Sequence, residues 1–269
     1  MATRISGLLL CVAGSFVVST AFAQDTTKIN NFSIAAEVSD YKYKEPGVMK
    51  VTGTMYGVTG EYLNSGGVGR IKQSMPIQFR ARFTYMQGDD LDYDGRLMSG
   101  TPFKRSGVHQ SFFDTIFAGG LEAKASERFS IAPYIGFGYR YLLDKDDGIA
   151  YDKVNNVYGI DYKREQVYYY LPMGADFKVA LGSGWRFALN TEFDVLLRGE
   201  NKSDGLKFRQ KSGYGTRASA KVEKHLPSVG FFAEPFYRYW SIGKSNVVDG
   251  YIEPKNNTNE FGLRVGASF

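Results

Sequence analysis

The sequence predicts an all-β protein, a ten-stranded antiparallel transmembrane β-barrel with extracellular extensions. Three observations lead to this prediction. Apolar and polar residues alternate with a period of two in ten segments. No stretch after residue 23 is apolar and long enough for a transmembrane helix. Charges of both signs gather on the polar faces of the alternating segments, which is typical of a barrel with a polar interior.

The first 23 residues have the composition of a secretory signal peptide. Arg4 supplies a positive charge, residues 8–18 form a short apolar stretch, and Ala21-Phe22-Ala23 is a small-x-small cleavage site. We expect cleavage after Ala23 (signal peptide 1–23), leaving residues 24–269 as the barrel. The single cysteine, Cys11, would leave with the signal peptide, so we expect no disulfide, no thiolate metal site and no cofactor.

The alternation is clearest after Met75, where Phe79 and Phe83 share one face while Arg80 and Arg82 share the other. Each predicted strand is long enough for the roughly 9–11 residues that cross a bilayer at a tilt. An even number is expected of bacterial single-chain barrels. The ten predicted strands cover residues 31–43, 51–63, 77–85, 110–124, 129–141, 167–179, 185–197, 213–224, 229–242 and 260–269.

The charged faces of these strands distinguish a membrane barrel from a soluble sandwich. A lipid-facing arginine near the bilayer midplane costs roughly 2–4 kcal/mol, so the charges should point into the lumen. A small barrel is filled by its side chains, whereas open channels need about 16 strands, so we expect a plugged, salt-bridged interior. The predicted lumenal charge network comprises Arg80, Arg82, Asp114, Glu122, Arg140, Asp176, Glu192, Asp194, Arg217, Glu234, Arg238, Glu260 and Arg264.

The connections should alternate between short periplasmic turns and long extracellular loops. The long ones are expected near residues 88–109, 143–165, 199–212 and 243–257. The first hairpin departs from the rule, with a short outer loop at Glu45-Pro46-Gly47 and a long inner turn at 64–73. In the third outer loop, residues 149–154 and 157–162 flank Asn155-Asn156, which predicts a small hairpin above the membrane.

One acidic segment stands out as a candidate chemical site. Counted on from Arg82, Asp90, Asp92 and Asp94 keep the lumenal parity, while Leu91 and Tyr93 keep the outward one. Crowded carboxylates raise one another's pKa, so one of them could act as a base. The alternative is a solvated acidic loop.

A calcium site is a further alternative for the same segment. Asp90, Asp92 and Asp94 match the first half of an EF-hand loop, but Thr101 stands where the bidentate glutamate belongs. His109 shares the outward parity of Phe113, which directs it away from the aspartates unless a bulge intervenes.

The order of these features resembles the omptin group of ten-stranded outer-membrane proteins. The resemblance rests on Asp90-Leu91-Asp92-Tyr93, the run from Tyr134 to Tyr139, the stretch from Tyr162-Lys163-Arg164 to Leu171-Pro172, and the terminal Phe269. It implies an extension above the bilayer and catalytic roles for Asp90 and Asp92. Omptin proteases also require an Asp–His pair on the fourth outer loop, and here residues 199–212 contain Glu200 and Asp204 but no histidine.

We therefore expect a non-enzymatic outer-membrane protein of a Gram-negative envelope that displays extracellular loops for binding, adhesion or envelope structure. The alternatives are an omptin-like endopeptidase and a narrow channel or small-solute transporter. Expected partners are outer-membrane lipid including lipopolysaccharide, an unidentified extracellular ligand, and the barrel assembly machinery. Secretion excludes nucleic acid despite the net charge of +5. The assembly signal would be Phe261, Leu263, Val265 and Phe269.

Overall fold

The computed structural model describes residues 29–269 apart from 73–74, 98, 147–149, 160–161 and 204. The expected signal peptide, residues 1–23, lies outside the described residues. Among the described residues, no helix is long and apolar enough to cross a membrane.

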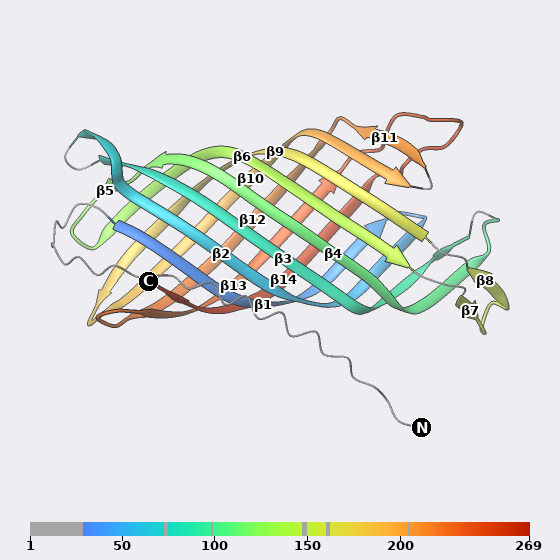
Figure 1. Ribbon diagram of the computed structural model, residues 1–269, viewed down its shortest axis with the longest axis horizontal. Helices are drawn as coiled ribbons and strands as arrows, with labels where there is room; N and C mark the ends of the chain where they lie inside the picture. The colour runs from blue at the N-terminus through green and yellow to red at the C-terminus, as the bar shows by residue number, and fades with distance from the viewer. Residues whose placement is uncertain (1–28, 73–74, 98, 147–149, 160–161, 204) are drawn as a thin grey trace, which may run out of the picture.

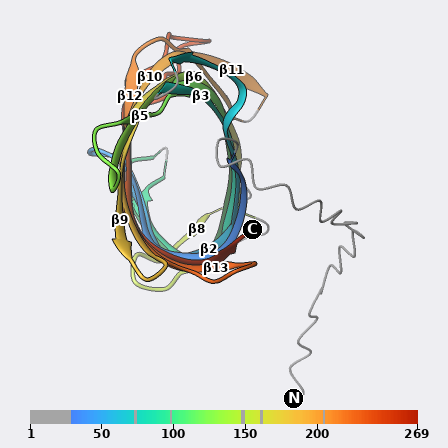
Figure 2. The ribbon, with the colours of Figure 1, turned by 90° about the vertical axis from the view of Figure 1, so that its left-hand side faces the viewer.

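Ten long antiparallel strands form a closed ring, which confirms the predicted fold class (Figures 1 and 2). The ring closes where the first and last strands pair, with Ile34 opposite Ala267. Its strands, in ring order, are β1 (Ile29–Glu45), β2 (Met49–Lys72), β3 (Met75–Arg96), β4 (Pro102–Leu121), β6 (Phe129–Asp146), β9 (Tyr162–Gly182), β10 (Trp185–Ser203), β12 (Gly213–His225), β13 (Gly230–Ile242) and β14 (Asn256–Ser268).

Four short strands complete the fold at the two ends of the barrel. At the end with short turns, β5 (Ala123–Lys124) pairs with β6. At the other end, β11 (Leu206–Gln210) extends β10, and β7 (Ala150–Asp152) pairs with β8 (Val157–Gly159) in a separate hairpin (Figure 1). Short turns mark the periplasmic end of such barrels, so β7, β8 and β11 belong to the extracellular end.

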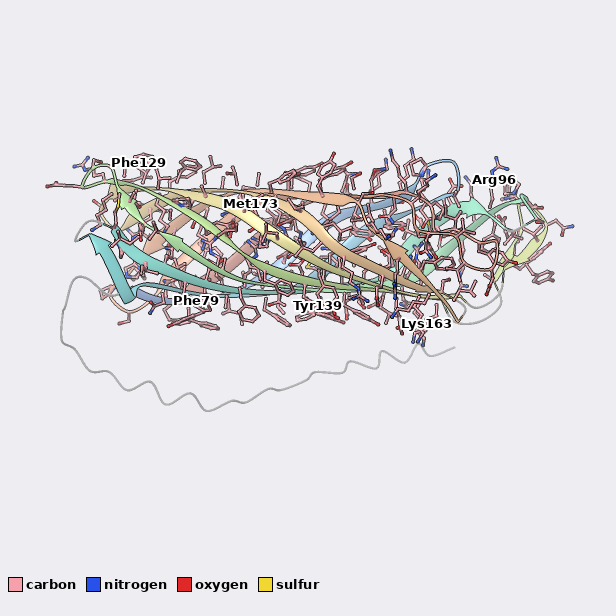
Figure 3. All side chains as sticks on the ribbon, turned by 90° about the horizontal axis from the view of Figure 1, so that it is seen from above. Phe79, Arg96, Phe129, Tyr139, Lys163 and Met173 are labelled. Atoms are coloured by element: carbon pink, nitrogen blue, oxygen red, sulfur yellow. The ribbon has the colours of Figure 1, made fainter. Side chains whose placement is uncertain are left out.

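The period-two alternation places apolar side chains on the outside of the barrel and charged side chains on the inside, the reverse of a soluble protein. On β3, Phe79 and Phe83 are 37% and 45% exposed, whereas Arg80 and Arg82 are only 4% and 7% exposed. Figure 3 shows Phe79, Tyr139 and Met173 on the outer wall of the barrel. Since apolar side chains cover the outside of the ring, its wall matches the hydrocarbon of a bilayer.

Several strands are longer than the bilayer requires, and this corrects two expected loops. β2 has 24 residues and β3 has 22, against the roughly 9–11 needed for a crossing. The expected outer loop 88–109 is wrong, because β3 continues to Arg96 and β4 begins at Pro102. The expected inner turn 64–73 is wrong for the same reason, because β2 continues to Lys72. At the extracellular end, the extra length of β3 and β4 makes the barrel project above the membrane as a paired sheet.

A β-bulge interrupts β3 where it enters this extracellular extension. Its register against β4 shifts between Gly88 and Leu91 and shifts back before Tyr93, with Gly107 at φ +78° on β4. The register of β3 against β2 shifts at the same level. An extra residue in one strand exchanges the two faces of everything beyond it. Leu91 therefore turns inward, with 0% exposure.

Candidate functional site

The centre of the barrel interior is an ionic layer built around one arginine. Arg217 of β12 lies 2.9 Å from Asp114 and 3.0 Å from both Glu192 and Asp194. Arg82 contacts Glu192 at 2.7 Å. All five side chains are buried. Because a buried charge needs a partner, three carboxylates depend on the Arg217 guanidinium.

A second ionic group lines the wall formed by β1, β13 and β14. Arg238 pairs with Glu37 and lies 2.6 Å from Glu260. Arg264 lies 2.8 Å from Glu37 and 3.2 Å from Glu234. Each arginine thus contacts two carboxylates, and Glu37 is shared between them.

The two groups are joined, and both continue towards the periplasm. Arg140 lies 3.5 Å from Asp114 and 3.8 Å from Glu260. Arg80 pairs with Asp176, and Glu122 accepts a hydrogen bond from Ser130 (2.8 Å). The structure places all thirteen charges of the proposed lumenal network inside the barrel.

The sequence analysis missed two carboxylates of this network. Glu37 is 4% exposed, and Glu61 lies 3.6 Å from Arg80. The signal was present, because Glu37 has the opposite parity to the outward-facing Ile34 and Val38.

Above the ionic layers, towards the extracellular end, the interior becomes an apolar plug. The larger of two clusters of buried residues lies here, and the Arg140 guanidinium lies over the Phe112 ring, 4.0 Å from its centroid. The second cluster lies beside the central ionic layer, where the Tyr170 hydroxyl donates a hydrogen bond to Asp114 (2.8 Å). The plug consists of Tyr41, Tyr43, Met49, Val51, Met55, Met86, Leu91, Val108, Phe112 and Leu142 in one cluster and Ile116, Tyr168, Tyr170, Leu196, Trp240 and Ile242 in the other.

A further ionic group closes the plug from outside. Arg164 pairs with Glu45 and lies 2.9 Å from Asp144 and 3.8 Å from Glu253. Its guanidinium stacks over the Tyr43 ring at 4.8 Å. Among the described residues, packed and buried side chains therefore occupy the extracellular half of the barrel.

The periplasmic half differs, because it contains a cavity of about 300 Å³. Residues of the periplasmic turn at Ser126, Glu127 and Arg128 line its mouth, and Arg80 and Arg82 belong to its inner end. We call this cavity the vestibule. Figure 2 looks into the barrel from this end.

The acidic segment does not face the lumen, so that expectation is wrong. Asp90 and Asp92 are exposed, while Leu91 enters the plug, because the bulge reverses the parity of β3. Asp94 lies 3.2 Å from Lys50 and 3.4 Å from Lys104. Although some burial opposes the effect, hydrogen bonds from these two lysines lower the pKa of the Asp94 carboxyl.

The same bulge gives His109 a partner that the sequence analysis did not consider. His109 stays on the outer wall, where its Nδ1 lies 3.3 Å from an oxygen of Asp89. Asp92 instead accepts a hydrogen bond from Ser106 (2.6 Å). Asp90 and Asp92 are therefore not brought to a histidine, and Asp204 of the fourth outer loop lies outside the described residues.

The calcium site predicted as an alternative at Asp90, Asp92 and Asp94 is not supported by a cluster of ligands among the described residues. Within the part of the chain that the structure describes, no group of three or more His, Cys, Asp or Glu side chains is arranged to hold a metal ion. Asp94 is already bound to two lysines, and Asp92 to a serine hydroxyl.

The predicted hairpin in the third outer loop is present and is hydrogen-bonded to β4. Asp152 accepts hydrogen bonds from the backbone N–H groups of Val154 (2.9 Å) and Asn155 (3.1 Å) within the hairpin, and from that of Lys104 on β4 (2.7 Å). A Cβ at Gly159 would lie 2.5 Å from the Phe103 ring, so only glycine permits this close packing. The hydrogen bond from the Asn155 side chain is the main cause that lowers the pKa of Asp152 to about 2.

The tip of this hairpin exposes apolar side chains beside the polar Lys153 and Asn156. The Tyr151 and Tyr158 rings lie 4.7 Å apart, and Val154 is 87% exposed. A second extracellular tip, in the loop after β13, exposes Val247 and Tyr251 on either side of a tight turn. Solvent-exposed apolar tips on a rigid support are typical of contact surfaces.

These features define the fold of an integral outer-membrane β-barrel, and solved structures support this assignment. The outer membrane protease OmpT from Escherichia coli aligns over 94% of this chain and 99% of its own, with a TM-score of 0.55 and 8% identity. At that identity the likeness shows the fold alone.

Two further solved barrels align less closely. Ail, the attachment invasion locus protein of Yersinia pestis, covers 89% of this chain and 99% of its own at 12% identity and a TM-score of 0.33. The translocator domain of autotransporter NalP from Neisseria meningitidis covers 91% of this chain and 90% of its own at 11% identity and a TM-score of 0.45. No family model and no curated protein matches the sequence.

Replacing Arg217 by methionine is expected to destabilise the barrel by roughly 3–5 kcal/mol, because three buried carboxylates lose their shared partner. The measurement is urea unfolding in lipid vesicles, followed by tryptophan fluorescence. The matched control is Arg198→Met, whose side chain is 58% exposed and pairs with Glu200. It should cost less than about 1 kcal/mol. Equal losses for the two variants would contradict the central role of Arg217.

The docking of the β7–β8 hairpin is expected to weaken only in strong acid. The pKa of Asp152 is about 2 in the folded protein and roughly 3.9 in an unfolded chain. Its stabilising contribution is therefore complete above about pH 4 and is lost as the pH falls through about 2. NMR signals of the Lys104 and Asn155 amides should titrate with a midpoint near pH 2, and Asp152→Asn should remove this step. A midpoint near 4 would show that the hydrogen bonds are not formed.

Proposed function

We propose that this protein is a non-enzymatic outer-membrane protein that uses a sealed barrel to present rigid extracellular hairpins to a binding partner. The observation that carries the proposal is the anchored tip with Tyr151, Val154 and Tyr158 exposed. Ordering a tip before it meets its partner lowers the entropy cost of binding. Adhesion to a surface fits such a tip better than transport through the barrel.

The barrel contributes rigidity to this function. A packed plug and a cross-linked ionic lumen resist deformation, because close-packed interiors have few alternative arrangements. The extension above the membrane, built by β3, β4, β6, β9 and β10, then holds the tips away from the lipid surface (Figure 1).

The omptin-like endopeptidase alternative receives little support from the described site. Asp90 and Asp92 point to solvent on the outer wall, and the Asp89–His109 pair lies outside the barrel rather than in a cleft. A general base needs a position within hydrogen-bond reach of a bound substrate, and a flat outer wall offers none.

We further propose two envelope partners. Lys163, Lys207 and Arg198 are each 58% exposed on the outer wall of the extracellular extension, where they can contact the phosphates of lipopolysaccharide. Lys163 lies at this end of the barrel in Figure 3. At the other end, β14 presents an outward apolar row to the barrel assembly machinery, formed by Phe261, Leu263, Val265 and Phe269.

Purified protein is expected to produce no stepwise conductance in planar bilayers, because the plug leaves no continuous water path. Insertion of the folded barrel is verified by its faster gel migration before boiling than after it. A channel-forming porin in the same bilayers provides the positive control. Regular conductance steps from the folded protein would favour the channel or transporter alternative.

Cells that produce the protein are expected to adhere to epithelial monolayers, and the variant Tyr151→Ser/Val154→Ser/Tyr158→Ser should reduce adhesion to the level of cells without the protein. These three are the exposed large apolar side chains of the hairpin. The matched control is Leu226→Ser, which removes an apolar residue of similar exposure (42%) from a periplasmic turn. Adhesion that is unchanged in the tip variant, or peptide cleavage by the wild type, would contradict the proposal.

A further inference from the structure

The vestibule contains a group of basic side chains at the periplasmic edge of the ionic layers. On its wall, Ala188 of β10 is paired with Lys178 of β9 on one side and with Lys221 of β12 on the other. All three residues line the cavity. Since neighbouring strands are about 4.8 Å apart, the two lysines are separated by about 10 Å of backbone with only a methyl group between them.

A third cation completes this group. Arg186 precedes Ala188 by two residues on β10, so it has the same lumenal orientation one level closer to the periplasm. Three basic residues therefore flank the small side chain of Ala188 on the barrel wall. A larger residue at this position would fill the space between their charged ends.

The local carboxylates satisfy these cations only in part. Lys178 lies 3.4 Å from Glu122. The Lys221 ammonium lies over the Phe232 ring, 4.3 Å from its centroid. Arg186 is opposite Glu223, but the Glu223 carboxylate accepts a hydrogen bond from Ser268. No carboxylate among the described residues forms an ion pair with Lys221 or Arg186.

The lining of the cavity as a whole also contains more basic than acidic side chains. Eight basic and six acidic side chains line the cavity, which leaves two positive charges in excess. The excess lies near the mouth, where the lining residues outside the ionic layers are five basic and three acidic side chains: Lys124, Arg128, Lys178, Arg186 and Lys221 against Glu122, Glu127 and Glu223. Low-dielectric walls concentrate the potential of such a cavity and raise the local concentration of anions.

We propose that the vestibule is a binding site for a small oxyanion, a molecule with a carboxylate or phosphate group that enters from the periplasm. Lys178, Arg186 and Lys221 donate charge-assisted hydrogen bonds to the oxyanion, which occupies the space left by Ala188. The Phe232 ring provides an apolar contact for the rest of the molecule. This site is independent of the extracellular tips.

Isothermal titration of the folded protein tests the site, in zwitterionic detergent at low ionic strength, with succinate and pyrophosphate as separate probes. At least one probe should bind saturably at one site per barrel, and the stronger of the two identifies carboxylate or phosphate as the preferred group. Lys221→Gln should weaken binding about tenfold or more, because it removes a charged donor. Ala188→Leu should weaken it similarly without changing any charge.

The control is Lys44→Gln, which removes a charge from the exposed outer wall at the extracellular end and should leave binding unchanged. Gel migration before and after boiling verifies the fold of each variant, and Arg186→Gln replaces Ala188→Leu if the latter fails to fold. The proposal is overturned if neither probe binds saturably. It is also overturned if Lys221→Gln binds as the wild type does, or if Lys44→Gln weakens binding as much as Lys221→Gln.

Discussion

The structure depends on the mutual compensation of buried charges within a closed ring. Arginines such as Arg217 and Arg238 each contact two or more carboxylates, and carboxylates such as Glu37 each contact two arginines. Lipid would penalise every one of these groups on the outer wall. Closure of the β1–β14 ladder is what allows the charges to face one another instead, while leaving no free sheet edge in the hydrocarbon.

Much of this arrangement could be predicted because it follows from a repeating local rule. In a bilayer, a strand such as Phe79-Arg80-Ala81-Arg82-Phe83 must turn its phenylalanines to the lipid and its arginines inward. This orientation predicts both a closed barrel and a charged interior. The rule works best in the membrane, where the solvent on one face is uniform and the cost of a wrong orientation is high.

The rule fails where one inserted residue in β3 exchanges the inward-facing and outward-facing positions of the residues beyond it. The inversion that turns Leu91 inward and Asp92 outward is a property of pairing with two neighbouring strands, so the period of β3 alone contains no trace of it. Gly53, Gly88 and Gly107 are local hints. The partner of Arg164 from the last loop, Glu253, is similarly beyond sequence periodicity, because a loop has none. The candidate chemical site was placed in this region, which explains why its geometry differed most from expectation.

The apolar plug also separates the solution at the periplasmic end of the barrel from the solution at its extracellular end. A solute that enters the vestibule must leave by the mouth through which it came, so occupancy reflects the periplasm alone. The tips, in turn, sample only the medium outside the cell. Conformational coupling between the two ends would have to pass through the packed interior. This interior includes the buried rings of Tyr170 and Trp240. The packed cross-section therefore separates the periplasmic vestibule from the extracellular tips.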